Sequence, residues 1–227
     1  MRLRSAEGDG GYRIVNSVLD VPETAHLLEW LESSLFTRSR AGARHLMQHP
    51  EIQRVAQDAR LLAIAGDFVG ESPRPYRATL FDKSSERNWL VTWHQDTALP
   101  LEVRRDASGW GPWSVKSGIN YAHAPARALS RVVALRLHFD DSESDNGPLR
   151  VIPGTHHLGV LSDAAVDEIV ATASPMDCLV GIGGIVAMRP LILHASSKVE
   201  SSRPRRVLHI EYADSMETID GFRIAIA

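Results

Sequence analysis

The chain has 227 residues and a mass of 25.0 kDa, with 44% hydrophobic and 23% charged residues, which are ordinary values for a globular protein with a sizeable core. A formal net charge of −3 and the lack of a dominant basic patch argue against binding to nucleic acid or to an anionic membrane. The single cysteine excludes an internal disulfide, and the sequence has neither a signal-peptide core nor a run of roughly 18 apolar residues, so we expect a cytoplasmic protein.

The first part of the chain, about residues 1–70, is predicted to be mainly helical. The segment YRIVNSVL, residues 12–19, is typical of a short strand. Residues 23–35 follow a Pro-Glu-Thr start signal and place leucines at helical spacing. Residues 50–69 begin with proline and end before Gly70, which predicts another helical segment.

From about residue 76 to residue 213, short β-rich runs alternate with clusters of Gly, Pro, Asp, Asn and Ser, a pattern that indicates a sandwich or barrel. One helix interrupts them at about residues 162–172, with Ser162 or Asp163 as its cap. Helices followed by strands predict an α+β fold in which a jelly roll packs against the N-terminal helices. Since no linker or repeat divides the chain, we expect one domain, residues 1–227.

The strand-like run RNWLVTW leads into the tetrapeptide WHQD, residues 93–96. Because side chains alternate along a strand, His94 and Asp96 are expected on the same face. An imidazole and a carboxylate a few Å apart are two of the three ligands of a facial metal triad. A lone His-x-Asp is more often an exposed polar pair at the start of a loop, so the metal interpretation depends on a third ligand.

His194, at the end of another β-run, is the candidate third ligand. Strands that are far apart in sequence can lie side by side in a double-sheet fold. Two imidazoles and one carboxylate leave three positions of an octahedral Fe(II) open, which is the ligand set of non-haem oxygenases. Zinc binds the same ligands, so the ligands alone do not choose the metal.

An anion-binding group is predicted close to His194. Arg205 begins the next β-run, and a hairpin would bring its guanidinium back to a position where it can bind the distal carboxylate of a dicarboxylate cosubstrate. Ser196 is on the same face as His194 and is expected to donate to that carboxylate. Lys83, upstream of WHQD, is a second cationic candidate. Taken singly, Arg205 and Lys83 also fit solvated surface charges, so the prediction depends on the joint pattern.

At this point the sequence resembles the phytanoyl-CoA dioxygenase-like family of Fe(II)/2-oxoglutarate-dependent oxygenases. The similarity runs from about Tyr76 to Ala213, and the order of its three segments is highly specific. These segments are WHQD at 93–96, NGPLRVIPGTHHLG at 146–159 and LHASSKVESSRPRRVLHIEYA at 193–213.

The resemblance implies a double-stranded β-helix core of the jelly-roll, cupin-like kind. It also implies that Fe(II) is the metal, that 2-oxoglutarate is the cosubstrate and that O2 is the oxidant. The implied iron ligands are His94, Asp96 and His194, and the implied ligands of the 2-oxoglutarate carboxylate are Arg205 and Ser196. The aspartate is present, so the chain does not resemble the halogenase variants, in which a small residue replaces it.

Candidates for substrate contact are less specific. Arg136 and His138 alternate with apolar residues in ALRLHF, so they point either into the cavity of the roll or to solvent. A buried arginine needs an anion, which makes Arg136 the candidate for a substrate carboxylate. His156, in PGTHHLG, is expected near the mouth of the site or on the plain surface.

The segment at residues 108–125 is rich in Gly and Trp and is a candidate lid or substrate wall. Trp113 and His123 are its candidate contact residues. Tryptophans in such a loop also serve as simple hydrophobic plugs, and that alternative stays open.

The predicted activity is hydroxylation of an unactivated C–H bond in a small molecule, with 2-oxoglutarate converted to succinate and CO2. The substrate is expected to carry a carboxylate, since no basic surface cluster suits the phosphates of coenzyme A. The same iron site also suits desaturation, epimerisation or cyclisation. Two other classes remain as alternatives: a non-catalytic jelly-roll sensor of a metal or small acid, and a zinc hydrolase. Neither needs the dicarboxylate-binding Arg205 and Ser196.

Overall fold

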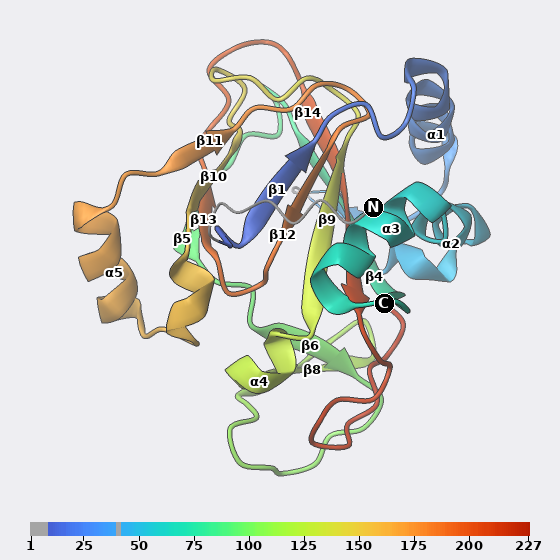
Figure 1. Ribbon diagram of the computed structural model, residues 1–227. Helices are drawn as coiled ribbons and strands as arrows, with labels where there is room; N and C mark the ends of the chain where they lie inside the picture. Colours follow the sequence, from blue (N-terminus) through green and yellow to red (C-terminus); the bar gives the residue numbers. More distant parts are fainter. Residues whose placement is uncertain (1–8, 40–41) are drawn as a thin grey trace.

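The computed structural model describes residues 9–39 and 42–227 (Figure 1). The first eight residues of the predicted helical part therefore lie outside the described residues. In the described ranges, no helix has both the length and the apolar character needed to cross a membrane. The fold is a mixed one, with antiparallel sheets and few helices, as the alternation of segments predicts.

The largest sheet has seven strands in the order β1-β12-β9-β14-β4-β3-β2. Its neighbouring strands pair antiparallel throughout the described residues. The long strands β4 and β14 form its centre, and their register pairs Lys83 with Arg205. The strands are β1 (Tyr12–Val15), β2 (Arg38–Ser39), β3 (Gly42–Ala43), β4 (Arg74–Lys83), β9 (Val132–His138), β12 (Ile185–Met188) and β14 (Arg205–Ala213).

A four-stranded sheet, in the order β11-β10-β13-β5, and a three-stranded sheet, in the order β6-β8-β7, complete the strands. In the four-stranded sheet, β5 and β13 place His94 directly opposite His194. The strands are β5 (Val91–His94), β6 (Ala98–Leu101), β7 (Trp113–Lys116), β8 (Ile119–His123), β10 (Leu149–Ile152), β11 (Met176–Cys178) and β13 (Leu193–Ser196).

The N-terminal helices cover one face of the large sheet. The helix α1 (Val21–Ser33) begins with a capping box in which Asp20 and Glu23 satisfy each other's backbone N–H groups. The predicted helical segment 50–69 is two helices, α2 (Pro50–Ala56) and α3 (Ala59–Val69). They separate at Asp58, because its side chain accepts from the amide of Arg60 and starts a new helix. The remaining helical segments are η1 (Leu46–Gln48), α4 (Ala126–Leu129), η2 (Thr155–Leu158) and α5 (Asp163–Thr172).

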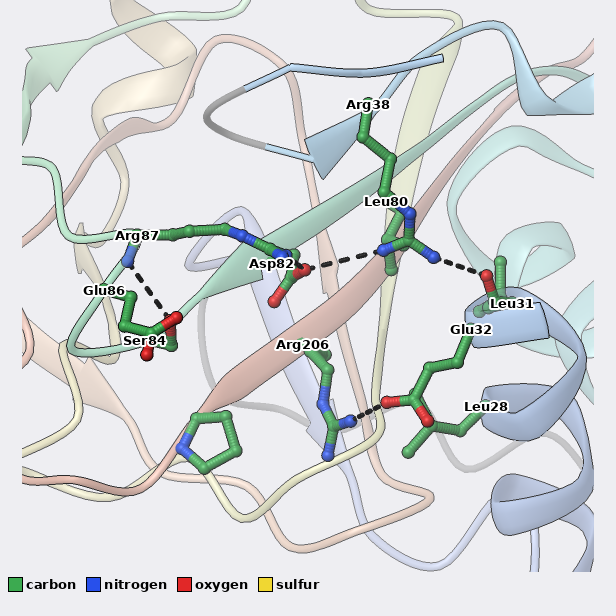
Figure 2. A pocket seen from close by; sticks show the side chains of 11 residues that line it. Leu28, Leu31, Glu32, Arg38, Leu80, Asp82, Ser84, Glu86, Arg87 and Arg206 are labelled. Carbon is green, nitrogen blue, oxygen red and sulfur yellow. Dashed lines mark hydrogen bonds and ion pairs between the residues drawn. The ribbon is translucent and has the colours of Figure 1, made fainter. Parts of the chain in front are cut away.

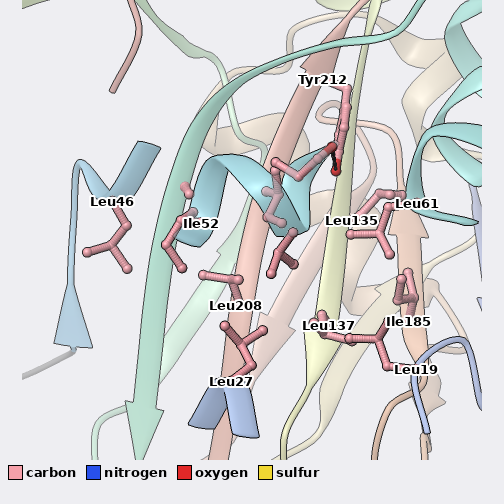
Figure 3. Packing of buried hydrophobic residues seen from close by; sticks show 14 of the residues in the cluster. Leu19, Leu27, Leu46, Ile52, Leu61, Leu135, Leu137, Ile185, Leu208 and Tyr212 are labelled. Carbon is pink, nitrogen blue, oxygen red and sulfur yellow. Dashed lines mark hydrogen bonds between the residues drawn. The ribbon is translucent and has the colours of Figure 1, made fainter. Parts of the chain in front are cut away.

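The main hydrophobic core lies between these N-terminal helices and the large sheet (Figure 3). Leu27 and Leu31 of α1 belong to the same buried cluster as Leu208 of β14, and burial of each such leucine contributes about 1.5–3 kcal/mol. Tyr212 also donates its hydroxyl hydrogen bond to the carbonyl of Ala56 at 3.0 Å, which joins α2 to β14. This core fixes the outer face of β4, β9 and β14, and the inner face of the same strands is left for the site described next.

Candidate metal centre and its anion-binding cavity

Three candidate metal ligands meet where β5 and β13 pair. Asp96 follows β5 by two residues, and its amide donates to the carbonyl of Pro190 at 2.9 Å. Its carboxylate oxygens lie 3.7 Å from His94 Nε2 and 3.4 Å from His194 Nε2. One ligand atom from each of these residues lies within 4.8 Å of the others. The structure therefore brings together the triad that the sequence predicts.

The orientation of both imidazoles suits metal binding. His94 Nδ1 lies 2.8 Å from the carbonyl of Thr92, and His194 Nδ1 lies 2.9 Å from the carbonyl of Ile192. A carbonyl only accepts, so each Nδ1 carries the proton and each Nε2 presents a lone pair on the side of Asp96. Such a backbone contact is the usual way in which a protein fixes the tautomer of a metal-binding histidine.

The protonation states of the triad also fit an ion. Burial opposes ionisation of Asp96, but the neighbouring imidazoles of His194 and His94 outweigh it and hold the pKa of Asp96 well below its usual range. Burial and the proximity of His194 lower the pKa of His94. A carboxylate and neutral imidazole are the forms that bind a divalent metal, so this donor set fits Fe(II) and, by ligand type alone, zinc.

The triad opens into a cavity of about 140 Å³ between the large sheet and the four-stranded sheet. Its large-sheet wall is strongly cationic, whereas the opposite wall carries the triad. The large-sheet residues are Arg77, Thr79, Phe81, Lys83, Arg136, Arg205 and His209. The facing residues are Trp89, Val91, His94, Asp96, Leu149, His194, Ala195 and Ser196.

At one end of the cavity, two cations converge on one hydroxyl. Arg205 Nη2 donates to Ser196 Oγ at 3.0 Å, and Lys83 Nζ donates to the same oxygen at 2.8 Å. Ser196 was expected to donate to a carboxylate, but its proton points to the carbonyl of Gly147 at 2.8 Å. Because a hydroxyl has one proton, Ser196 acts in this geometry as the acceptor that aligns the two cations.

Arg205 has unused hydrogen-bonding capacity at this end. Only 3% of the residue is exposed, yet its Nε and Nη1 have no hydrogen-bond partner among the described residues. Burial and the charge of Arg136 lower the pKa of Arg205 to about 9. Burial, Arg205 and Arg136 also lower the pKa of Lys83 to about 7. An anionic ligand would accept from these unpaired buried donors. It would also offset the positive charge that the site otherwise disfavours.

Arg136 lies in the middle of the cavity and belongs to a chain of contacts along the inner face. Its Nη1 lies 3.1 Å from His209 Nδ1, and its Nε is buried without a partner in the described part of the chain. Since arginine only donates, His209 accepts at Nδ1 and donates from Nε2 to Glu211 Oε1 at 3.2 Å. Glu211 is also paired with Arg77. This places Arg136 inside the cavity and leaves one of its donors for a ligand.

The other predicted substrate contacts do not line this cavity. His138 is completely buried beside it, where burial and two arginines, Arg205 and Arg136, lower its pKa to about 3. The Gly- and Trp-rich segment supplies two strands, β7 and β8, of the three-stranded sheet. Trp113 lies on β7, and the centroid of its ring is 5.9 Å from that of Phe222.

Two predicted histidines also lie elsewhere. His123 is exposed on β8, and its Nδ1 lies 2.6 Å from Thr97 Oγ1. His156 lies on η2, 3.4 Å from Asp9. Neither residue lines the cavity, although His123 contacts Thr97, which directly follows Asp96.

Several cavity residues are absent from the sequence prediction. Trp89 lies with its ring 5.1 Å from the ammonium of Lys83, and Arg77, Thr79 and Phe81 line the wall. The period-two spacing of these last three residues with Lys83 along YRATLFDK is the signal that could have found them, because it places all four on one face of β4.

A larger cavity, of about 420 Å³, lies among the residues that alternate with these on β4 and β14 (Figure 2). Its arginines already have partners. Arg206 binds Asp140 at 2.6 Å and also pairs with Glu32, while Asp82 pairs with Arg87 and with Arg38. These ion pairs hold together the strand ends that carry Lys83 and Arg205, and they leave no buried, unpaired guanidinium among the residues drawn.

This chain is similar to a known protein family and to several known proteins. The family model described as "Phytanoyl-CoA dioxygenase (PhyH)" matches residues 26–207. L-proline trans-4-hydroxylase from Streptomyces griseoviridis is 26% identical over 185 residues, which cover 70% of this chain. The chain spans 61% of the length of that relative.

Two solved structures share the fold. EctD from S. alaskensis with bound Fe matches with a TM-score of 0.69 and 17% identity, covering 90% of this chain and 73% of that one. HygX from Streptomyces hygroscopicus with nickel and 2-oxoglutarate bound matches with a TM-score of 0.65 and 17% identity, covering 92% and 85%. At these identities the likeness shows the fold alone. The family match over residues 26–207 agrees with the family that the sequence resembles. The chain belongs to the phytanoyl-CoA dioxygenase family.

Proposed function

We propose that this chain is an Fe(II)/2-oxoglutarate-dependent oxygenase that hydroxylates an unactivated C–H bond of a small, carboxylate-bearing molecule and forms succinate and CO2. The observation that carries the proposal is the pair of unused donors on buried Arg205, in the same cavity as the triad. A metal sensor or a zinc hydrolase needs the triad but has no use for this second anion site. We further propose that the facing sheets form a double-stranded β-helix and that the chain is one domain.

In this proposal each residue has a distinct role. His94, Asp96 and His194 hold Fe(II), which when bound supplies the oxidising chemistry by activating O2 at the expense of 2-oxoglutarate. Arg205 and Lys83 bind the distal carboxylate of 2-oxoglutarate, and Ser196 keeps the two cations aligned. The half-buried triad limits the access of water, which strengthens these charge interactions.

Arg136 is the proposed contact for the carboxylate of the substrate. Its position on the large-sheet wall of the cavity that also contains the triad, and its unused Nε, support this role. The name of the curated relative, an L-proline hydroxylase, supports a small amino acid as the first class to try.

Cofactor binding is the first test. Anaerobic addition of Fe(II) and 2-oxoglutarate should produce a weak visible charge-transfer absorption. His94→Ala or Asp96→Ala should abolish it, and His123→Ala, which removes an exposed histidine on another sheet, should not. Tight zinc binding with no effect of 2-oxoglutarate on the spectrum would instead support a hydrolase.

Turnover is the second test. A screen of amino acids and small carboxylic acids, beginning with L-proline, should contain compounds that accelerate succinate formation above the uncoupled rate. Arg136→Ala should raise KM for such a compound more than KM for 2-oxoglutarate. The product mass then decides the outcome, since a gain of one oxygen means hydroxylation and a loss of two hydrogens means desaturation or cyclisation. An absence of acceleration across the screen, with both cofactors bound, would favour the sensor.

A further inference from the structure

A second group of metal-binding side chains lies outside the cavity of the triad. It consists of Asp9, just before β1, and the neighbouring residues His156 and His157 on η2. One ligand atom from each lies within 4.8 Å of the others, and the imidazole rings have a centroid distance of 3.8 Å. The group shares no residue with the triad, and the proposed oxygenase reaction does not use it.

The imidazole of His156 is the feature that calls for a ligand. Only 7% of its side chain is exposed, yet neither ring nitrogen has a hydrogen-bond partner within the described ranges. Its Nε2 is 3.4 Å from Asp9 Oδ2, which is longer than an ordinary hydrogen bond. Two ligands that each lie about 2.0–2.1 Å from one tetrahedral ion are separated by roughly this distance.

The surrounding backbone holds these groups in place without an ion. The amide of Gly11 donates to Asp9 Oδ1 at 3.0 Å, and the amide of Gly154 donates to the carbonyl of Gly10 at 2.9 Å. A Cβ on Gly11 would lie 2.2 Å from His156 Nδ1, so the ring packs directly on the glycine and only its Nε2 faces Asp9. A preorganised carboxylate and imidazole lower the cost of binding a metal.

The nearby charges allow a cation. A pocket of about 330 Å³ adjoins the group and contains Arg189. The guanidinium of Arg189 donates to the carbonyls of Ser130 and Phe68 at 2.9 and 3.0 Å. These contacts occupy two of its nitrogens, and the Asp9 carboxylate offsets its positive charge.

We propose that Asp9, His156 and His157 form a second metal site, for a divalent transition ion of borderline softness such as Zn²⁺. Two imidazole nitrogens and one carboxylate oxygen are the donors that suit this class of ion, and the exposure of His157 leaves a coordination position for water. The ion fastens the segment before β1 to η2. The adjacent Thr155 accepts from the amide of Leu193 at 2.9 Å, so η2 is itself bonded to the strand that carries His194.

The test counts Zn²⁺ bound to metal-free full-length protein by titration calorimetry and by metal analysis after gel filtration. We expect two ions for the wild type, one for His157→Ala, one for His194→Ala and none for the double variant. His26→Ala, which removes an exposed histidine on α1, should still bind two. Zn²⁺ should also raise the Tm of His194→Ala, but not that of the double variant.

The proposal is overturned if the wild type binds one ion that His194→Ala removes, or if His157→Ala still binds two. Since His157 is exposed, its replacement should leave the Tm in EDTA unchanged. If that Tm falls, Asp9→Asn replaces His157→Ala in the experiment, because it keeps the shape of the side chain. Asp9→Asn should weaken the second Zn²⁺ by more than roughly tenfold, since even partners outside the ligand set typically contribute that much. Unchanged affinity in Asp9→Asn overturns the proposal.

Discussion

Arg205 is the residue on which the proposed function depends most. Its guanidinium is buried against Ser196 and retains two donors without partners among the residues described. Arg206, its neighbour, points to the opposite face of β14 and binds Asp140. The two side chains therefore differ in surroundings although they are adjacent in sequence, which makes them a matched pair for mutation.

Arg205→Ala should weaken 2-oxoglutarate binding by roughly 2–5 kcal/mol, because it removes one partner of a desolvated charge pair. Iron affinity should change little. Arg206→Ala should lower stability while keeping 2-oxoglutarate affinity, which calorimetry can measure for both variants. If Arg205→Ala binds 2-oxoglutarate as the wild type does, Lys83 or Arg136 must hold the carboxylate instead.

Lys83 adds a pH dependence to cosubstrate binding. Burial and the neighbouring arginines lower its pKa to about 7 in the free protein, so above pH 7 it is mostly neutral. A bound carboxylate favours the charged form and raises this pKa, so binding above pH 7 takes up a proton. The affinity for 2-oxoglutarate should therefore fall as pH rises from 7 to 9, by up to about tenfold per pH unit.

The matched variant is Lys83→Met, which keeps an unbranched side chain of nearly the same length but cannot take up the proton. Its affinity for 2-oxoglutarate should be weaker at pH 6.5 and nearly independent of pH between 7 and 8, below the pKa of about 9 of Arg205. Calorimetry in two buffers of different ionisation enthalpy would count the protons taken up. A wild-type affinity that is constant over this range would contradict the assignment of Lys83 to the carboxylate.

Among the elements, β13 and the turn before β10 jointly position the anion site. Ser196 on β13 donates to the carbonyl of Gly147, whose φ of +67° is in the left-handed region that favours glycine. A Cβ at Gly147 would lie 2.5 Å from the carbonyl oxygen of Ser197. The glycine of the NGPL motif thus permits the close approach that orients Ser196.

Gly147→Ala should lower the free energy of unfolding by about 1–3 kcal/mol through backbone strain and should also weaken 2-oxoglutarate binding. The control is Gly154→Ala, where φ is +82° but nothing lies within 4 Å of the added methyl. The control should share the loss of stability in urea unfolding but keep the 2-oxoglutarate affinity. Equal affinities in the two variants would show that Gly147 does not position Ser196.

Across the whole molecule, the cavity holds an excess of positive charge. Arg77, Lys83, Arg136 and Arg205 face only two carboxylates, those of Asp96 and Glu211, among the described residues near the triad. In the free protein, these positively charged side chains therefore repel one another inside a cavity that is shielded from water. Binding of a dianionic acid together with a metal relieves the repulsion. Folding and cosubstrate binding are coupled through this charge.

We expect 2-oxoglutarate, added with Fe(II) under anaerobic conditions at about 100 times its Kd, to stabilise the protein by about 2.7 kcal/mol. For a chain of this length that corresponds to a rise in Tm of roughly 5–11 °C. Differential scanning calorimetry can measure it, with succinate as a control for nonspecific anion effects. Arg205→Ala should lose most of the rise.

The structure brings the predicted triad together, and part of that arrangement follows from local rules while the pairing of His94 with His194 is a long-range contact. His94 and Asp96 share a face through period-two alternation, and the short connection from His194 returns Arg205 to the same site. The spacing could not show that the proton of Ser196 is used by Gly147, since that contact joins distant segments. Trp113 and His123 lie outside the lining of the cavity, and nothing local in the sequence shows that their segment supplies two strands of a separate sheet.

The placement of His194 and Ser196 two residues apart on β13 has a consequence for directed evolution. In the proposed function, iron and cosubstrate recognition share this strand, so randomising it would disturb both at once. Lys83 and Arg205 lie on the other sheet and can vary alone. Moving a cation by two residues along a strand shifts it by about 6.6 Å. Lengthening or shortening its side chain by one methylene shifts it far less. A library that seeks acceptance of shorter or longer oxo acids should therefore keep residues 194–196 fixed and vary side-chain length at 83 and 205.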